Sequence, residues 1–223
     1  MIRLKPATIS IAAKATSIAI EPSDVYAIVA DKEPPLDSKS LIKSDIAKAS
    51  DIGIDKFVVH PSCEPIADEL RAEFIKNSQE SLNELAEFAH LRGAVIAVEN
   101  LPRTCLGRDS KEMLELISVN DKLRVCFDTN HVLKENVVDF VKNVKDKIVT
   151  LHVSDCDFVN ERHWLPGEGK VDWPELTTAL KEINYNGVWM YEIGLKTPDS
   201  IKRERDLTFV DFVHNAEQLF KQQ

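Results

Sequence analysis

From about residue 40, segments with the apolar spacing of helices alternate with short apolar runs typical of strands. Apolar residues that recur every three to four positions predict helices over residues 41–49, 65–92, 110–117, 135–146, 173–183 and 199–222. Between them, short β-branched runs predict strands at 57–60, 94–99, 124–128, 147–153 and 187–193. Strands that alternate with helices in this way are typical of a mostly parallel sheet. The sequence therefore predicts an α/β protein.

The first sixty residues fit this pattern less well. The runs SIAIEP (17–22) and VYAIVAD (25–31) predict two more strands, which we assign as the second and third strands of a barrel whose fourth strand ends at His60. Sixty residues are too few for three full strand-helix units of ordinary length. We therefore expect the first unit to be abbreviated, or the barrel to be incomplete. With 223 residues, 43% of them hydrophobic, we expect a single domain over residues 1–223.

Four predicted strands end in a residue that can bind a metal or transfer a proton. These residues are Glu99, Asp128, His152 and Glu192. Each one alone has a simpler interpretation as a helix cap or a loop hydrogen-bonding residue. In a parallel barrel, however, the carboxyl ends of the strands meet at one mouth. Four ionisable groups buried there are costly unless they are paired or hold a cation, so their convergence predicts a divalent metal site.

The long segment between His152 and Trp173 shows neither the helical spacing nor the strand pattern of apolar residues. A loop of this length is usually functional. We expect it to fold over the mouth of the barrel.

The composition of the chain indicates which partners and which cellular compartment to expect. The net charge of −9, from 37 acidic and 28 basic residues, argues against a protein whose affinity depends on neutralising phosphates, although a local basic patch stays open. The four cysteines have no CxxC spacing, which favours free thiols in a reducing compartment. The N-terminal residues do not resemble a signal peptide, and no run approaches the roughly 20 apolar residues of a membrane span. We therefore expect a cytoplasmic protein with no membrane partner.

Five motifs, in order, point to a known family. They are VEN (98–100), FDTNH (127–131), LHVSD (151–155), RHWLPGEGKVDW (162–173) and YE (191–192). Over about residues 55–195 the chain resembles the xylose-isomerase-like, or AP-endonuclease-2-like, TIM barrels. The resemblance implies a TIM-type (β/α)₈ barrel with one to three divalent metals at its mouth. The family includes sugar isomerases and epimerases, hydroxypyruvate isomerase, dehydroshikimate dehydratase and endonuclease IV, so the fold alone does not determine the chemistry.

By this resemblance, Glu99, Asp128, His152 and Glu192 hold one divalent metal. An oxygen-rich set with one imidazole suits Mn²⁺, Mg²⁺ or Co²⁺ somewhat better than Zn²⁺. In the epimerase branch of the family the two glutamates also serve as acid and base on the two faces of the sugar, through a metal-stabilised enediolate. The resemblance therefore favours a metal-dependent isomerase or epimerase of a small sugar or hydroxy-carbonyl compound.

Five further residues are predicted to contact substrate: His131, Arg162, Asn100, His60 and His163. By the resemblance, His131 either contacts substrate or binds an additional metal, which would lie near His131 and His163; a capping role is its alternative. Asn100 and the neighbouring Arg103 are placed to bind substrate hydroxyls or a phosphate, although simple loop positions are almost as good an interpretation. Arg162 occupies the long loop, where the similar epimerases place a basic residue.

An endonuclease IV-like AP endonuclease is the main alternative. His60 matches a histidine of that enzyme, and Glu161, Arg162 and His163 take the place of its Asp-x-His pair. Where the nuclease needs another histidine, this chain offers only Asp31 or Glu33, so one metal site is broken. The acidic net charge also makes nucleic acid an unfavoured partner. A dehydroshikimate dehydratase-like lyase, a non-catalytic metal-binding protein and a homo-oligomer stay open.

Overall fold

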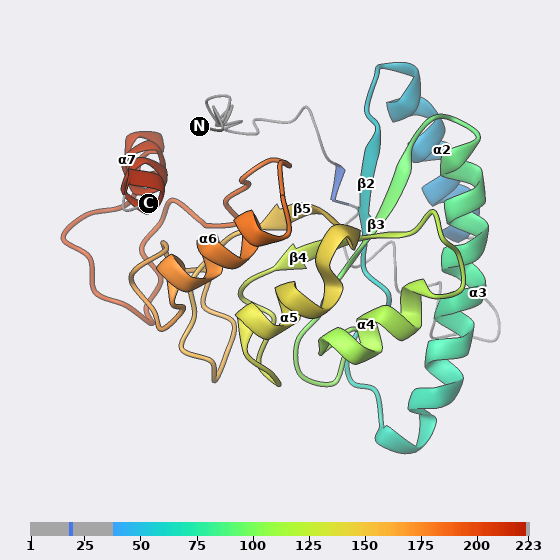
Figure 1. The fold of residues 1–223 in the computed structure, drawn as a ribbon, viewed down its shortest axis with the longest axis horizontal. Helices are drawn as coiled ribbons and strands as arrows, with labels where there is room; N and C mark the ends of the chain where they lie inside the picture. The colour runs from blue at the N-terminus through green and yellow to red at the C-terminus, as the bar shows by residue number, and fades with distance from the viewer. Residues whose placement is uncertain (1–17, 20–37, 222–223) are drawn as a thin grey trace.

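The computed structural model describes residues 18–19 and 38–221 of the chain. Its centre is a parallel sheet whose five strands lie side by side in chain order, β1-β2-β3-β4-β5 (Figure 1). The strands are β1 (Ile18–Ala19), β2 (Lys56–Val59), β3 (Val95–Glu99), β4 (Arg124–Asp128) and β5 (Ile148–His152). Because all five are parallel, their carboxyl ends lie at the same edge of the sheet. The predicted α/β architecture is confirmed.

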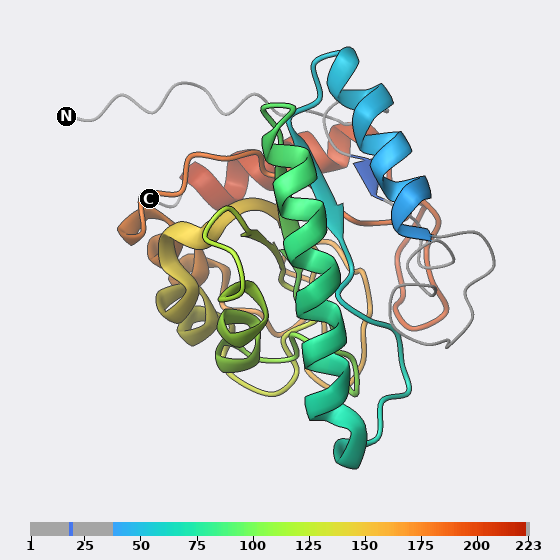
Figure 2. The same cartoon turned by 90° about the vertical axis from the view of Figure 1, so that its right-hand side faces the viewer.

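Helices connect the strands and cover the outside of the sheet. They are α2 (Ser38–Asp51), α3 (Arg71–His90), α4 (Ser110–Ile117), α5 (Val137–Val144), α6 (Trp173–Glu182) and α7 (Phe209–Lys221), with 3₁₀ turns η1 (Asp68–Leu70) and η2 (Lys145–Lys147). Successive helices pack against one another around the sheet, from α2 to α7. Figure 2 shows the long α3 in front of β2, with α2 beside it. Because the helices cover the side of the sheet, the ends of the strands are lined by the connecting loops.

Side chains alternate between two apolar layers. Phe57, Val98 and Phe127 belong to the large core between the sheet and the helices. Ala97 and Cys126, one position away, belong to a small cluster on the other face of the strands. Since alternate residues of a strand share a face, Glu99 and Asp128 continue the face of this small cluster.

Local capping explains where several helices begin. The N-cap of α4 is Asp109, whose carboxylate accepts a hydrogen bond from Glu112 N at 2.9 Å. The predicted helix over 65–92 is shorter, because η1 precedes α3 at Arg71.

The predicted closing helix over 199–222 was wrong in its first ten residues. The carboxylate of Asp211 accepts hydrogen bonds from both N and Oγ1 of Thr208, and these bonds hold Thr208 at the start of α7.

The front of the sheet differs from the predicted order. We placed VYAIVAD (25–31) as a strand between SIAIEP and the strand that ends at His60. Instead β1 pairs directly with β2, with Ile18 opposite Phe57 and Ala19 opposite Val58. The predicted separation of SIAIEP from the strand that ends at His60 is therefore wrong. The strand predicted at residues 25–31 lies outside the described part of the chain. The expectation of an abbreviated first unit falls on the same undescribed residues.

The last predicted strand, over residues 187–193, is reduced to one parallel bridge. Val153 pairs with Tyr191, through hydrogen bonds from Val153 N to Met190 O at 2.8 Å and from Glu192 N to Val153 O at 3.1 Å. This single bridge still sets Glu192 next to the end of β5. Residues 153–172 contain neither helix nor extended strand, in agreement with the predicted long loop.

Candidate metal centre

The structure brings the four strand-end residues together. Glu99, Asp128 and His152 are the last residues of β3, β4 and β5, and Asp128 lies directly opposite His152 in the strand register. Glu192 follows the bridge at Tyr191. One ligand atom from each of the four residues lies within 4.8 Å of the other three.

The imidazole of His152 lies among the three carboxylates. Its Nδ1 is 3.1 Å from Glu99 Oε1, 3.3 Å from Glu192 Oε2 and 3.9 Å from Asp128 Oδ2. Glu99, Asp128 and His152 are buried, whereas the side chain of Glu192 is 45% exposed. The cluster is therefore closed on the protein side and open at Glu192, as a site that binds both a cation and a small molecule requires.

The carboxylates shift one another's proton affinity. Burial together with the nearby Glu192 and Glu99 raises the pKa of Asp128 well above its usual value. Burial also acts to raise the pKa of Glu99, but His152 and His60 outweigh it and hold that pKa well below normal. Burial acts to raise the pKa of Glu192, but the interaction with His152 outweighs it and the pKa falls to about 2. Three acids thus compete for the positive charge of His152.

One oxygen of this cluster has no partner. Asp128 Oδ1 accepts a hydrogen bond from Asn130 N at 2.6 Å, but the buried Oδ2 has no hydrogen-bond donor. A buried carboxylate oxygen without a donor is costly, and more so when it faces other carboxylates. A divalent cation between Asp128, Glu99, His152 and Glu192 would satisfy this oxygen and offset the excess negative charge. The donor set therefore fits a divalent metal.

A second combination of the same residues includes sulfur. Cys126, Glu99 and His152 also lie within 4.8 Å of one another by their ligand atoms. Burial raises the pKa of the Cys126 thiol to about 12, whereas only a thiolate is a good metal ligand. Burial lowers the pKa of His152, but the sulfur of Cys126 and the carboxylates of Glu99 and Glu192 outweigh it, so the net shift is upward. The oxygen-rich set is the better match to a hard cation.

Two predicted substrate contacts hold the centre in place. The Asn100 amide donates to Asp128 O at 2.9 Å and accepts from Asp128 N at 2.7 Å, so both of its polar atoms are engaged by the backbone of β4. This fixes the end of β4 next to β3. His60 Nε2 lies 3.2 Å from Glu99 Oε2 and orients that carboxylate from β2. Its pKa is raised: burial lowers it, but Glu99 outweighs burial.

His131 joins the centre to the surrounding loops. Its Nδ1 lies 2.9 Å from Asn100 O and 3.5 Å from Glu99 Oε1, and its Nε2 lies 3.6 Å from Glu161 Oε1. Burial lowers its pKa and outweighs the nearby carboxylates of Glu99 and Glu161, which act to raise it. The His163 ring meets the His131 ring edge to face at 6.3 Å, and its Nδ1 lies 3.0 Å from Glu192 O. Neither residue belongs to a group of three metal-binding side chains within the described part of the chain. The expected additional metal near them is therefore without support in this arrangement.

Arg162 is engaged within its own loop. Its Nε donates to Asp157 Oδ2 at 2.8 Å, and its guanidinium lies 5.6 Å from the centre of the Trp164 ring. Its backbone N donates to Asn130 Oδ1 at 2.9 Å. This last contact ties the long loop to the residues that follow Asp128, so the loop does pack against the end of β4.

Sequence reasoning missed the role of Asp155. Its buried carboxylate accepts hydrogen bonds from Cys156 N, Val171 N, Gly167 N and Trp173 Nε1 at 2.8–3.1 Å. A Cβ at Gly169 would lie 2.3 Å from Asp155 Oδ1, so only glycine fits there. Asp155 therefore organises the loop from inside. The motif placed it three residues after His152 but gave no sign that donors surround it.

Comparisons with known proteins agree with the fold. Residues 4–209 match the family model described as xylose isomerase-like TIM barrel. The crystal structure of a D-tagatose 3-epimerase-like protein superposes with a TM-score of 0.77 at 24% identity, over 93% of this chain and 76% of that one. The predicted (β/α) barrel class is thereby confirmed.

Curated relatives share only part of their length with this chain. An uncharacterized protein of Methanocaldococcus jannaschii is 31% identical over 156 residues, which are 66% of this chain and 53% of the relative. Fructoselysine 3-epimerase of Escherichia coli O157:H7 is 28% identical over 122 residues, 51% of this chain and 44% of that enzyme. The chain thus spans about half the length of the curated relatives it matches. Within the described residues, none of the helices is long and apolar enough to cross a membrane.

Proposed function

This chain belongs to the xylose isomerase-like TIM barrel family, and from that premise we propose that it is a divalent-metal-dependent isomerase or epimerase of a small sugar or hydroxy-carbonyl compound. The observation that carries the proposal is the convergence of Glu99, Asp128, His152 and Glu192 around the unsatisfied oxygen of Asp128. The named relatives support the same class, since they include a fructoselysine 3-epimerase.

The metal would be held by these four side chains. When bound, a divalent cation polarises a substrate carbonyl and the adjacent hydroxyl, which acidifies the carbon-bound proton between them. Mn²⁺, Mg²⁺ and Co²⁺ suit the three carboxylates and one imidazole better than Zn²⁺ does.

Proton transfer is assigned to the two glutamates. Glu192 stands at the open side of the cluster, where its carboxylate is accessible to a substrate and can act as the base that removes the carbon-bound proton. Glu99 lies across the cluster on β3, where His60 and His152 hold it ionised. An epimerase needs one group to remove a proton and another to return it on the opposite face, and Glu99 and Glu192 are the two carboxylates that would share these roles.

The remaining residues position these groups. His131, next to Glu99, is proposed to hydrogen-bond a substrate hydroxyl through Nε2. Asn100 and His60 are proposed to fix Asp128 and Glu99. His163 holds the carbonyl of Glu192, and Arg162 secures the loop above the centre.

Solvent deuterium exchange tests the proposal without knowledge of the natural substrate. Protein stripped with EDTA and reloaded with Mn²⁺ is incubated in D₂O with a panel of ketoses and hydroxyaldehydes, and deuterium at carbon is read by NMR. We expect exchange only with metal present and strong loss in Glu192→Gln. Exchange that is equal in stripped and reloaded protein contradicts the metal-dependent mechanism.

A further inference from the structure

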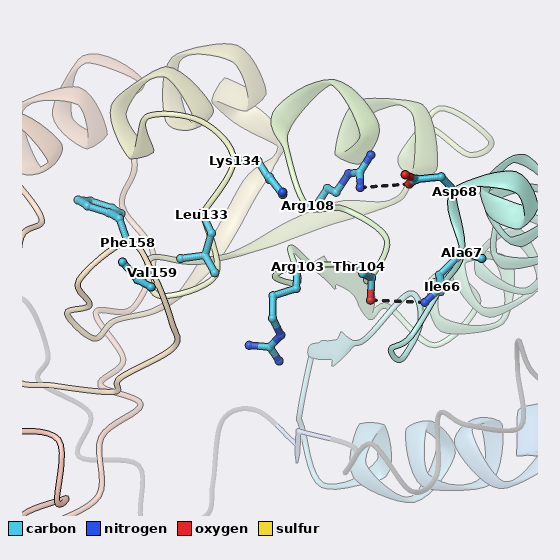
Figure 3. A pocket seen from close by; sticks show the side chains of 10 residues that line it. All are labelled: Ile66, Ala67, Asp68, Arg103, Thr104, Arg108, Leu133, Lys134, Phe158 and Val159. Carbon is cyan, nitrogen blue, oxygen red and sulfur yellow. Dashed lines mark hydrogen bonds and ion pairs between the residues drawn. The ribbon is translucent and has the colours of Figure 1, made fainter.

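A pocket of about 540 Å³ has cations along its wall, although the chain as a whole is acidic. Its charged lining residues are Arg103, Arg108, Lys134 and the single acid Asp68. Figure 3 shows Arg108 and Lys134 on the same side of the pocket in this view, and Phe158 and Val159 at the end away from Ile66 and Ala67. The pocket therefore combines apolar ends with a cationic wall.

A chain of contacts joins this pocket to the candidate metal centre. Arg103 Nη1 lies 3.2 Å from Glu161 Oε2, and Glu161 Oε1 lies 3.6 Å from His131 Nε2. His131 Nδ1 in turn lies 3.5 Å from Glu99 Oε1. Lys134 follows His131 by only three residues. The pocket and the candidate metal centre are therefore connected through the side chains of Arg103, Glu161 and His131.

The charge of Arg103 is already balanced. Its guanidinium makes a hydrogen-bonded pair with Glu64 and a second ion pair with Glu161. These pairs raise the pKa of Arg103 and hold its side chain against the loop. Arg103 therefore lines the pocket, but its positive charge is already paired with Glu64 and Glu161.

Arg108 and Lys134 are not balanced in this way. The nearest acid to Arg108 is Asp68, whose oxygen is 3.6 Å from Nη1, beyond hydrogen-bond distance, on a side chain that is 82% exposed. Lys134 has no ion pair with any residue that the structure describes, and it is exposed. Arg108 thus has only a long ion pair with an exposed acid, and Lys134 has none within the described residues. Two such cations at one wall attract an oxyanion, and a guanidinium together with an ammonium suits phosphate or carboxylate.

We propose that Arg108 and Lys134 form an oxyanion subsite, so that the substrate of this enzyme is a sugar with a phosphate or carboxylate group. The apolar residues Phe158 and Val159 come from the long loop and would cover the carbon skeleton between the anion and the metal centre. The inference rests on the proposed function, because it assigns the substrate class of the same site.

Kinetics with matched substrates test the subsite. Mn²⁺-loaded protein is assayed by deuterium exchange with D-fructose, D-fructose 6-phosphate and the keto-uronate of the same chain length. We expect KM for at least one anionic sugar to be about tenfold or more below that of fructose, since charge-assisted hydrogen bonds are roughly twice as strong as neutral ones. The comparison between phosphate and carboxylate identifies the anion. An equal KM for all three sugars overturns the inference.

Charge-removing variants locate the effect. Arg108→Gln and Lys134→Gln are each expected to raise KM for the anionic sugar about tenfold, and by a larger factor than they raise KM for fructose. Lys181→Gln is the matched control, because this exposed lysine lies in the last turn of α6, at the end remote from the strand carboxyl ends. A KM that rises equally in the control variant, or in none of the variants, contradicts the subsite.

Phosphate binding to metal-free protein separates this inference from the proposed function. Calorimetric titration of EDTA-stripped protein with inorganic phosphate should show binding that Arg108→Gln weakens. Phosphate that binds only when metal is present is bound at the centre, which overturns the subsite. If metal-free protein binds phosphate but no sugar exchanges deuterium, the subsite is retained and the proposed function is overturned. If fructose exchanges deuterium and anionic sugars are not preferred, the proposed function is retained and the subsite is overturned.

Discussion

Two buried aspartates near the strand ends have opposite surroundings. Asp128 and Asp155 are both fully buried, at 0% exposure. Asp155 accepts four hydrogen bonds, from three backbone amides and the indole of Trp173. Asp128 accepts one at Oδ1, and its Oδ2 faces other carboxylates without a donor.

The difference separates a folding role from a binding role. A buried carboxylate that is surrounded by donors stabilises the chain around it. A buried carboxylate left unsatisfied among like charges destabilises the protein until a cation arrives. We therefore interpret Asp155 as the organiser of the long loop and Asp128 as a metal ligand, although both lie near the carboxyl end of a predicted strand.

The largest expected effect is on turnover at Asp128. Asp128→Asn removes a charged ligand and should lower the rate of deuterium exchange by about 10³-fold, since the cation supplies most of the stabilisation of developing negative charge. Exchange is measured at saturating Mn²⁺ with the most active sugar of the panel. An undiminished rate in this variant would place the metal elsewhere.

The next effect is on folding at Asp155. Asp155→Ala leaves four buried donors without an acceptor and should lower the free energy of unfolding by about 3 kcal/mol. Urea denaturation in EDTA measures it. Asp128→Asn under the same conditions should unfold at equal or higher urea, because burial beside Glu192 and Glu99, which raises the pKa of Asp128, makes its charge unfavourable in the metal-free protein.

If Asp155→Ala does not fold, Trp173→Phe provides a milder test of the same hydrogen-bond cluster. It removes one donor to Asp155, and we expect a smaller loss of about 1 kcal/mol. If Asp128→Asn proves as destabilising as the changes around Asp155, the proposed division between the two aspartates fails.

A third effect is stabilisation by metal. At a free Mn²⁺ concentration about 100 times its Kd, the free energy of unfolding should rise by about 2.7 kcal/mol. Urea denaturation with and without Mn²⁺ measures this gain, which should persist in Trp173→Phe and vanish in Asp128→Asn. Equal gains in both variants would show that the cation binds outside the cluster.

The smallest effect concerns pH and Asp157, two residues beyond Asp155. Partial burial raises its pKa, but the amides of Asn160 and Val159 and the guanidinium of Arg162 outweigh this and lower the pKa from 3.8 to about 2. The stabilisation is therefore present above about pH 3.8 and is lost as the pH falls through about 2. We expect about 1 kcal/mol, because Asp157 is less enclosed than Asp155.

Urea denaturation of wild type and Asp157→Asn, at neutral and at acidic pH, measures this contribution. The two proteins should differ at neutral pH and converge in acid. A difference that grows as the pH falls has the wrong sign for a lowered pKa.

Strand ends were predictable because their chemistry is local. The runs before Glu99, Asp128 and His152 are apolar and β-branched, and parallel pairing then brings those residues to one edge. The role of Asp155 was not predictable, because its donors come from residues up to 18 positions away in a loop without periodicity. The strand before Glu192 was overestimated for a related reason: its apolar run packs against α6 and α7 through Trp189 and Tyr191 rather than through a regular ladder.

Substrate contacts were harder to predict than metal ligands. Asn100 follows Glu99 and looks available in sequence, yet both its amide atoms bind the backbone of Asp128. Arg162 was expected above the site, but Asp157 already accepts its Nε. Long polar side chains find partners that depend on how loops pack, and loop packing has no signature in the spacing of residues.

Direct titration of metal tests the central claim, that the unsatisfied carboxylate of Asp128 belongs to a cation site. EDTA-stripped protein is titrated with Mn²⁺ in a calorimeter, for wild type, Asp128→Asn and Trp173→Phe. We predict that wild type and Trp173→Phe each bind a single Mn²⁺ ion per chain and that Asp128→Asn does not bind it detectably. No binding by the wild-type protein, or equal binding by Asp128→Asn, would contradict the account.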